Sequence, residues 1–276
     1  MAAALLDRMA FSGCWRDYQR RVLEEFDLHA GDRRLHLVAA PGSGKTVVGL
    51  EMLRRLGRPA LVLAPTQIVR DQWLARLVPL FLDGPPGSAE VSRSLADPAE
   101  LTAATYQALH ALAARGEADW AASLAKSLCA RGQPTLVLDE AHHLRREWWS
   151  ALTELISHLP NATIIALTAT PPYDAPFAEW ARYEAMCGPI DLEVTVPELV
   201  RNGDLCPHQD HVLFSRADHD AIDLLDRRRR GLAAFLSTIR DDAELLDELA
   251  AHPWLSSPEA LVEEILEAPE VLSSIL

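Results

Sequence analysis

The stretch that decides the fold reads Leu35-His36-Leu37-Val38-Ala39-Ala40-Pro41-Gly42-Ser43-Gly44-Lys45-Thr46. Its apolar start predicts a buried strand, and the periodic sequence that follows predicts a helix. The two glycines let backbone N–H groups converge on phosphate oxygens, while Lys45 supplies charge for the β- and γ-phosphates and Thr46 offers a hydroxyl to Mg²⁺. The sequence therefore predicts a site for a nucleoside triphosphate and Mg²⁺, formed by Pro41, Gly42, Ser43, Gly44, Lys45 and Thr46.

An acidic pair follows a second apolar run. Residues 135–138 predict another buried strand, and Asp139-Glu140-Ala141-His142 comes directly after it. Because the carboxyl ends of parallel strands meet at one edge of a sheet, Asp139 is expected to bind Mg²⁺ together with Thr46. Glu140 would then orient the attacking water. Such a pair can also be only a solvated strand end, but the phosphate loop favours the catalytic interpretation.

Two hydroxyls follow a third strand-like run. Thr168-Ala169-Thr170 comes after residues 163–167, and its hydroxyls can hydrogen-bond His142 from the same sheet edge. Taken alone, this tripeptide is more typical of a capping turn. Its position after the two other segments is what makes it informative.

In this order, the three segments resemble the motifs of the first RecA-like motor domain of superfamily-two helicases and translocases, of the DEAH type. The style is most similar to the helicase subunits of restriction systems and to their repair-helicase relatives. The resemblance covers residues 11 to 214 and implies an α/β fold, with a mostly parallel sheet covered by helices on both faces. It also implies ATP and Mg²⁺ as cofactors and ATP hydrolysis coupled to movement on DNA or RNA. The implied catalytic residues are Lys45, Asp139 and Glu140, and the implied relay residues are His142, Thr168 and Thr170.

Weaker matches extend the resemblance. Gln19, within residues 15–20, looks like the glutamine with which the family reads the adenine edge. The segments around 61–73 and 105–107 look like motifs Ia and Ib, which contact nucleic acid in the family. Each has a structural alternative. Tyr18 can be a core aromatic, and the role of Thr66 can be limited to capping the next helix. The implied nucleic-acid contacts are Pro65, Thr66, Thr105 and Tyr106.

The chain shows no second RecA-like domain, although the family needs one for its remaining motifs and arginines. We expect that domain in cis or in a partner subunit, and the apolar ending at Leu276 suggests a longer natural protein. Because an arginine finger contributes about 10³- to 10⁵-fold in rate, the isolated domain is expected to hydrolyse ATP weakly. A nucleotide-gated, non-catalytic protein-interaction module is the alternative, and a P-loop kinase or transferase is a weaker one.

Composition and charge set further limits. The 276 residues are 49% hydrophobic, enough for a full core. The expected domains are a RecA-like ATP-binding domain at 1–214 and, at 215–276, a helical, acidic appendage or the start of a linker to a second motor domain. The net charge of −14 opposes nucleic-acid binding, but residues 231–276 hold ten acidic side chains and one basic. We therefore expect DNA or RNA binding, with DNA favoured, to be weak for this chain.

Four cysteines without Cys-x-x-Cys spacing fit a reduced compartment better than a disulfide framework. Cys206, His208 and His211 could hold zinc only with a fourth ligand such as Cys187, and ordinary loop residues are the favoured interpretation. No apolar run approaches the roughly 18 to 20 residues of a membrane helix, and no signal-peptide pattern appears. We expect a cytoplasmic protein without a membrane partner.

The chain alternates between predicted strands and helices, which indicates a parallel sheet with its loops at one edge. Strands are expected near 35–39, 60–64, 101–104, 135–138 and 162–167, with 191–196 and 209–214 completing the sheet. Helices are expected near 45–56, 67–80, 106–114, 120–129 and 147–158, and in the appendage over 218–235, 241–250 and 258–266. We expect Arg227 to Arg230 to form a solvated helix face and Trp148-Trp149 to pack into the core rather than bind nucleic acid.

Overall fold

The computed structural model describes residues 4–29, 31–116, 119–144, 146–207, 212, 218–258, 261, 262 and 265, except for the side chains of residues 146 and 147. The chain separates into two compact units, Met1–Pro207 and His208–Leu276. The boundary expected from the sequence, after residue 214, lies among residues that the structure does not describe. That boundary therefore stays a prediction.

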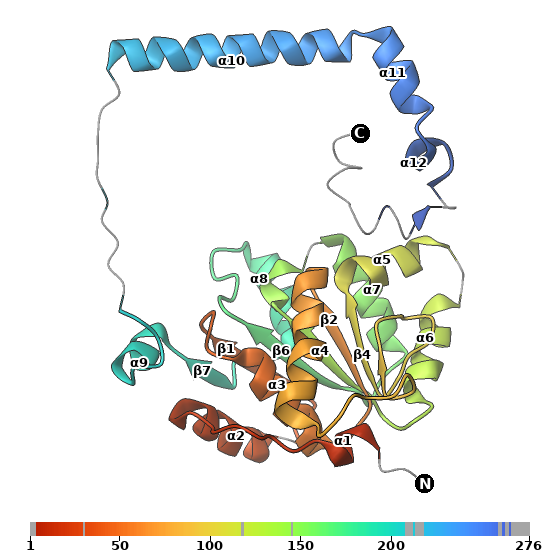
Figure 1. Cartoon of the computed structure of the whole chain (residues 1–276), viewed down its shortest axis with the longest axis vertical. Coiled ribbons are helices and arrows are strands. Elements are labelled where there is room, and N and C mark those ends of the chain that lie inside the picture. Colours follow the sequence, from red (N-terminus) through yellow and green to blue (C-terminus); the bar gives the residue numbers. More distant parts are fainter. Residues whose placement is uncertain are drawn as a thin grey trace. The chain divides into compact units, whose positions relative to one another are not determined.

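The first unit is built on one parallel sheet (Figure 1). Its strand order is β3-β4-β2-β5-β6-β1-β7, and every paired strand runs parallel to its neighbour. The strands are β1 (Arg34–Ala39), β2 (Ala60–Ala64), β3 (Val91–Ser92), β4 (Leu101–Thr105), β5 (Thr135–Asp139), β6 (Thr163–Thr168) and β7 (Leu192–Val194). Most positions in the five longer strands are buried, as expected for a parallel sheet covered on both faces. The predicted α/β class is confirmed.

The order of the central strands places the three motifs side by side. Strand β6 lies between β5 and β1, so the acidic pair, the threonine pair and the phosphate loop leave adjacent strands. Asp139 is in register with Leu167, and Val38 is in register with Thr168. The three segments therefore meet at the carboxyl edge of the sheet, as the sequence predicts.

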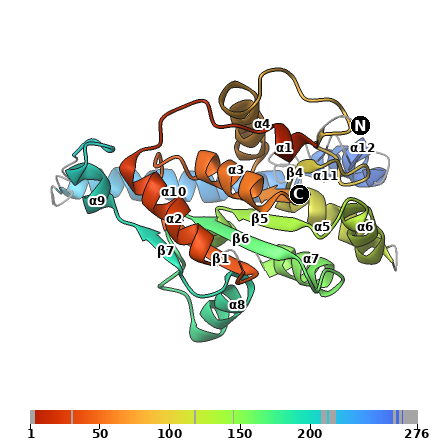
Figure 2. The same cartoon turned by 90° about the horizontal axis from the view of Figure 1, so that it is seen from below.

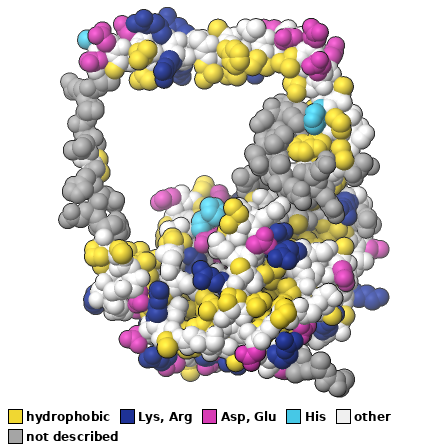
Figure 3. Space-filling view, in the orientation of Figure 1, with side chains coloured by type: hydrophobic (Ala, Val, Ile, Leu, Met, Phe, Trp, Pro, Cys, Tyr) yellow, Lys and Arg dark blue, Asp and Glu magenta, His cyan; other side chains and the backbone are white. Residues whose placement is uncertain are grey.

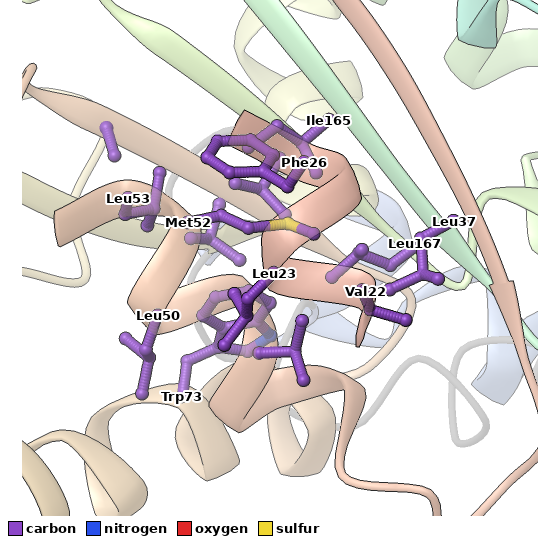
Figure 4. Packing of buried hydrophobic residues seen from close by; sticks show 14 of the residues in the cluster. Val22, Leu23, Phe26, Leu37, Leu50, Met52, Leu53, Trp73, Ile165 and Leu167 are labelled. Carbon is purple, nitrogen blue, oxygen red and sulfur yellow. The ribbon is translucent and has the colours of Figure 1, made fainter. Parts of the chain in front are cut away.

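Helices cover both faces of the sheet (Figure 2). One core cluster joins the sheet to α1 (Leu5–Arg8), α2 (Asp17–His29), α3 (Lys45–Leu56) and α4 (Gln67–Phe81). The other joins it to α5 (Tyr106–Ala114), α6 (Trp120–Cys129), α7 (Arg146–Ser157) and α8 (Phe177–Cys187). Figure 4 shows part of the first cluster, to which α2 contributes Phe26, α3 contributes Leu50 and Met52, and β1 and β6 contribute Leu37, Ile165 and Leu167. Helix α9 (Val196–Arg201) follows β7.

Helix boundaries follow local capping rules. The hydroxyl of Thr66 accepts a hydrogen bond from the N–H of Val69 and so caps α4, which begins at Gln67. Helix α8, which the sequence analysis did not assign, begins after Pro176 and ends at Cys187, before Gly188, which has a φ of 83°. Proline before a helix and glycine after it are recognisable boundary signals, so α8 could have been found from the sequence.

The second unit is helical in its described residues. It contains α10 (His219–Arg240), α11 (Ala243–Ala250) and α12 (Pro253–Ser256). Helix α10 runs five residues beyond the predicted end at Phe235 and buries none of its residues. The predicted strand at 209–214 and the predicted helix at 258–266 fall largely outside the described residues.

The four arginines from Arg227 to Arg230 lie exposed on α10, beside exposed apolar side chains (Figure 3). Arg227 Nε and Arg230 Nε donate to the backbone carbonyls of Asp223 and Asp226, at 3.4 Å and 3.3 Å, and not to the carboxylates. Across the described residues, no helix is both long and apolar enough to cross a membrane.

Candidate functional site

The phosphate loop turns through two residues with positive φ. Gly42 has a φ of 77° and Gly44 a φ of 87°, a backbone region that side chains other than glycine rarely adopt. Helix α3 begins at Lys45, and no side chain caps its first N–H groups. Since the first four N–H groups of a helix have no partner within it, this end can bind an anion.

The loop borders a cleft of about 420 Å³. Residues from the phosphate loop, α2, α4 and the acidic pair meet around it, among them Gln19, Gly42, Gly44, Lys45, Thr46, Arg76, Asp139 and Glu140. A Cβ atom on Gly44 would lie 2.8 Å from Gln19 Nε2, so a side chain there would crowd the cradle. The buried Oγ of Ser43 has no hydrogen-bond partner within the described part of the chain. These features fit a nucleotide phosphate group with a bound cation.

Lys45 joins the phosphate loop to the acidic pair. Its side chain is buried, and its Nζ donates to the carbonyl of Ala39 at 3.0 Å. The same Nζ lies 3.2 Å from Glu140 Oε1. The lysine and the glutamate therefore form an ion pair at the border of the cleft.

Asp139 is the most deeply buried carboxylate of the site, with 3% of its surface exposed. Trp73 Nε1 donates to its Oδ2 at 2.7 Å. Burial raises the pKa of Asp139 from 3.8 to about 6, against the opposing effect of the Trp73 hydrogen bond. A carboxylate held in this way is costly without a cation beside it, which suits a ligand of Mg²⁺.

Replacing Asp139 by Asn is expected to stabilise the protein when metal and nucleotide are absent. The native state binds this proton more tightly than the unfolded chain, so stability falls as pH rises from 3.8 to about 6. Asn removes that penalty, and the free energy of unfolding should rise by about 1 to 3 kcal/mol near pH 7.5 and change little near pH 4. Urea unfolding in EDTA would measure this, with exposed Asp174→Asn as the control. A variant less stable than the wild type at both pH values would contradict it.

Glu140 and His142 contact the end of β6 at the carboxyl edge of the sheet. Glu140 adopts a left-handed conformation with a φ of 49°, which is uncommon for a residue other than glycine. Its Oε2 accepts a hydrogen bond from the N–H of Ala169 at 3.3 Å and lies 3.4 Å from His142 Nδ1. The same Nδ1 lies 2.7 Å from the hydroxyl of Thr168, and burial lowers the pKa of His142. Thr168 thus makes the predicted contact, whereas Thr170 is exposed.

Gln19 lies behind the phosphate loop in a buried position. Its Nε2 donates to the carbonyl of Ser43 at 3.3 Å, and its Oε1 accepts from the N–H of Arg16 at 3.2 Å. The hydroxyl of Tyr18 also donates to the Ser43 carbonyl. Gln19 borders the cleft, but both ends of its amide already bind the protein, so adenine reading stays a prediction.

The residues predicted to contact nucleic acid have different surroundings. Tyr106 is fully buried, donates to the carbonyl of Asp139 at 3.0 Å and stacks on Trp148. The predicted contact of its side chain with nucleic acid is therefore wrong, and Tyr106 packs in the core instead. Thr105 is 7% exposed, and its hydroxyl caps α5 by accepting from the N–H of Ala108. Pro65 is buried, and only Thr66 of the four is exposed.

The alternative zinc site gains no support. Cys206 is exposed, while Cys187 is buried inside the first unit beside Tyr183. No group of three metal-ligating side chains occurs in the described residues, and His208 and His211 lie outside them.

A family model described as type III restriction enzyme, res subunit, matches residues 13–173, more than half of the chain. The chain belongs to this family. The matched span contains the phosphate loop, the acidic pair and the threonine pair. The predicted helicase motor domain is therefore confirmed at the level of the family, including its similarity to restriction subunits.

Individual relatives cover the chain to different extents. The DNA 3'-5' translocase XPB2 of Sulfurisphaera tokodaii is 26% identical over 253 residues, which are 92% of this chain and 52% of that protein. The UvrABC system protein B of Thermus thermophilus is 46% identical over 54 residues, 20% of this chain and 8% of its own length. Among solved structures, the Hef helicase domain of Pyrococcus furiosus has a TM-score of 0.47 at 19% identity, covering 67% of this chain and 41% of that one. The chain thus spans about half the length of the translocase and less than half of the other two relatives.

The structure adds residues that the sequence analysis did not assign to the site. Val69, Gln72, Arg76 and Leu80 line the cleft from one face of α4, and Phe11 lines it from the chain's beginning. The spacing of the four α4 residues is helical, so a face toward the nucleotide could have been proposed once α4 was placed beside α3. The sequence alone does not give that placement.

Proposed function

We propose that this chain is the ATP-binding and ATP-hydrolysing first motor domain of a DNA translocase or helicase. The observation that carries the proposal is the 3.2 Å approach of Lys45 Nζ to Glu140 Oε1 within a cleft that Thr46 and Asp139 also line. The phosphate-binding Lys45, the Mg²⁺ ligands Thr46 and Asp139, and the water-orienting Glu140 would then all lie around this one cleft. Membership of the res-subunit family supports this assignment.

Each residue has a separate role in the proposal. The N–H groups at the start of α3 and the Lys45 amine bind the phosphates, and Gln19 borders the adenine end. Thr46 and Asp139 hold Mg²⁺, which would supply charge stabilisation to the phosphates when bound. Glu140 orients the attacking water, and its contact with His142 connects it to Thr168 of β6. A change at Glu140 on ATP binding or hydrolysis can thereby be transmitted to the loop after β6.

DNA is the proposed nucleic acid because the relative XPB2, which matches 92% of this chain, is a DNA 3'-5' translocase. Exposed Thr66 is the proposed contact with the sugar-phosphate strand. A second RecA-like domain, in cis or in a partner subunit, would complete the ATP site. Without its arginines, hydrolysis should be slow while binding persists.

The test combines calorimetry with a hydrolysis assay on the chain. ATP with Mg²⁺ is expected to bind, and phosphate release should rise when single-stranded or duplex DNA is added. No uptake of adenine nucleotide would reject the nucleotide site. Uptake with hydrolysis that RNA stimulates and DNA does not would reject the DNA assignment alone.

A further inference from the structure

Trp73 is a fully buried side chain that the proposed mechanism does not use. It belongs to α4, and its ring has 0% of its surface exposed. Its Nε1 donates to Asp139 Oδ2 at 2.7 Å. The ring is therefore in direct contact with the carboxylate that we assign to Mg²⁺.

The opposite edge of the indole lies against α3. A Cβ atom on Gly49 would come within 2.5 Å of Trp73 Cη2, so the absence of a side chain at this position admits the ring. Gly49 is one turn along the helix that begins at Lys45. Trp73 also belongs to the cluster that joins α2, α3 and the sheet (Figure 4).

The indole thus spans two elements that carry different parts of the site. Helix α3 provides Thr46, and the end of β5 provides Asp139. A planar ring with two side-chain torsions, packed on all sides, fixes the distance between them better than a flexible side chain could. The rigid indole of Trp73 therefore connects α3 to Asp139 directly.

The chemistry of the contact suits this task. An indole N–H is only a donor, so it cannot compete with the carboxylate for a cation. It occupies one lone pair of Oδ2, and a carboxylate has about four lone-pair sites, so Asp139 can still bind Mg²⁺ or a metal-bound water. Partners of this kind orient a metal ligand without touching the metal, and their loss typically weakens metal affinity by about 10- to 100-fold.

We propose that Trp73 is a positioning residue for the Mg²⁺ of the nucleotide site, which it serves by holding Asp139 against α3. The inference rests on the proposed function, because it takes Asp139 as a ligand of Mg²⁺. It adds a residue of α4 to a site otherwise formed by the phosphate loop and the acidic pair.

Trp73→Phe separates positioning from packing, since it keeps a buried ring and removes the N–H donor. The matched control is Trp120→Phe, which alters a buried tryptophan of α6 in the other core cluster. Each purified chain would be titrated with a fluorescent ATP analogue, first in EDTA and then at increasing Mg²⁺. Circular dichroism would establish that each variant is folded.

In Trp73→Phe, the half-saturating Mg²⁺ concentration should rise about tenfold or more, with analogue affinity in EDTA within about twofold of wild type. Trp120→Phe should change neither quantity. A folded Trp73→Phe variant with wild-type Mg²⁺ dependence would overturn the proposal. Failure of the wild type to bind the analogue under any condition would instead reject the proposed function.

A measurement on the wild type covers the case in which Trp73→Phe does not fold. In ¹⁵N-labelled protein bound to the analogue, Mg²⁺ should shift the indole N–H resonance of Trp73, assigned through its contacts with Gly49. Asp139→Asn should abolish that shift. A Trp73 resonance that Mg²⁺ leaves in place, while the phosphate-loop amides move, would overturn the proposal.

Discussion

Glu140→Gln should abolish most ATP turnover while leaving ATP binding intact. The amide keeps the size of the side chain and can still accept from the N–H of Ala169, but it is a poor acceptor for a proton of the attacking water. A loss of about 10²- to 10⁴-fold in the hydrolysis rate is expected. The measurement is phosphate release at saturating ATP and DNA, for the chain alone or together with the proposed second motor domain.

The matched control for this variant is Glu154→Gln, an exposed glutamate of α7 away from the cleft. It should leave turnover unchanged. If Glu140→Gln also hydrolysed ATP at the wild-type rate, the catalytic assignment would fail. ATP binding without measurable hydrolysis by the wild type would instead favour the alternative of a nucleotide-gated, non-catalytic interaction module.

Lys45→Ala is expected to weaken ATP binding more than any other single change in the loop. The amine lies 3.2 Å from Glu140 Oε1 and is buried at the start of α3, where phosphate charge would be screened little by water. A hydrogen bond to a charged group contributes about 1.5 to 3 kcal/mol, which corresponds to a loss of about 10- to 150-fold in affinity. Isothermal calorimetry with Mg·ATP would measure it.

The chain contains one other lysine, which provides the control. Lys126 is exposed on α6, so Lys126→Ala removes the same charge from the protein without touching the cleft. Its affinity for Mg·ATP should match that of the wild type. Equal weakening by both variants would mean that overall charge, and not a phosphate contact, sets the affinity.

Much of the site could be predicted because its signals are local. The phosphate loop is continuous in sequence, and its glycines report the positive φ values that the structure contains. The acidic pair and the threonine pair each end an apolar strand, and parallel strands place their ends at one edge. The contact of Thr168 with His142 follows from that rule.

Other features could not be predicted, since they depend on which elements become neighbours. The burial of Tyr106 results from packing against Trp148 of α7, a residue distant in sequence. The hydrogen bond from Trp73 to Asp139 joins positions that are 66 residues apart. The order of the motifs predicted that Tyr106 contacts nucleic acid. This prediction was wrong because a sequence pattern does not show which way a side chain points at the start of a helix.

The sequence by itself determined the parallel α/β fold, the order of the motifs along the chain and the residue types that meet at the sheet edge. Only the tertiary structure decided that β6 lies between β5 and β1, that one face of α4 lines the cleft, and that Trp73 holds Asp139. Backbone propensities and strand-end rules act over a few residues, so a sequence expresses them directly. Side-chain contacts between distant elements depend on how those elements pack, and packing is a property of the whole fold.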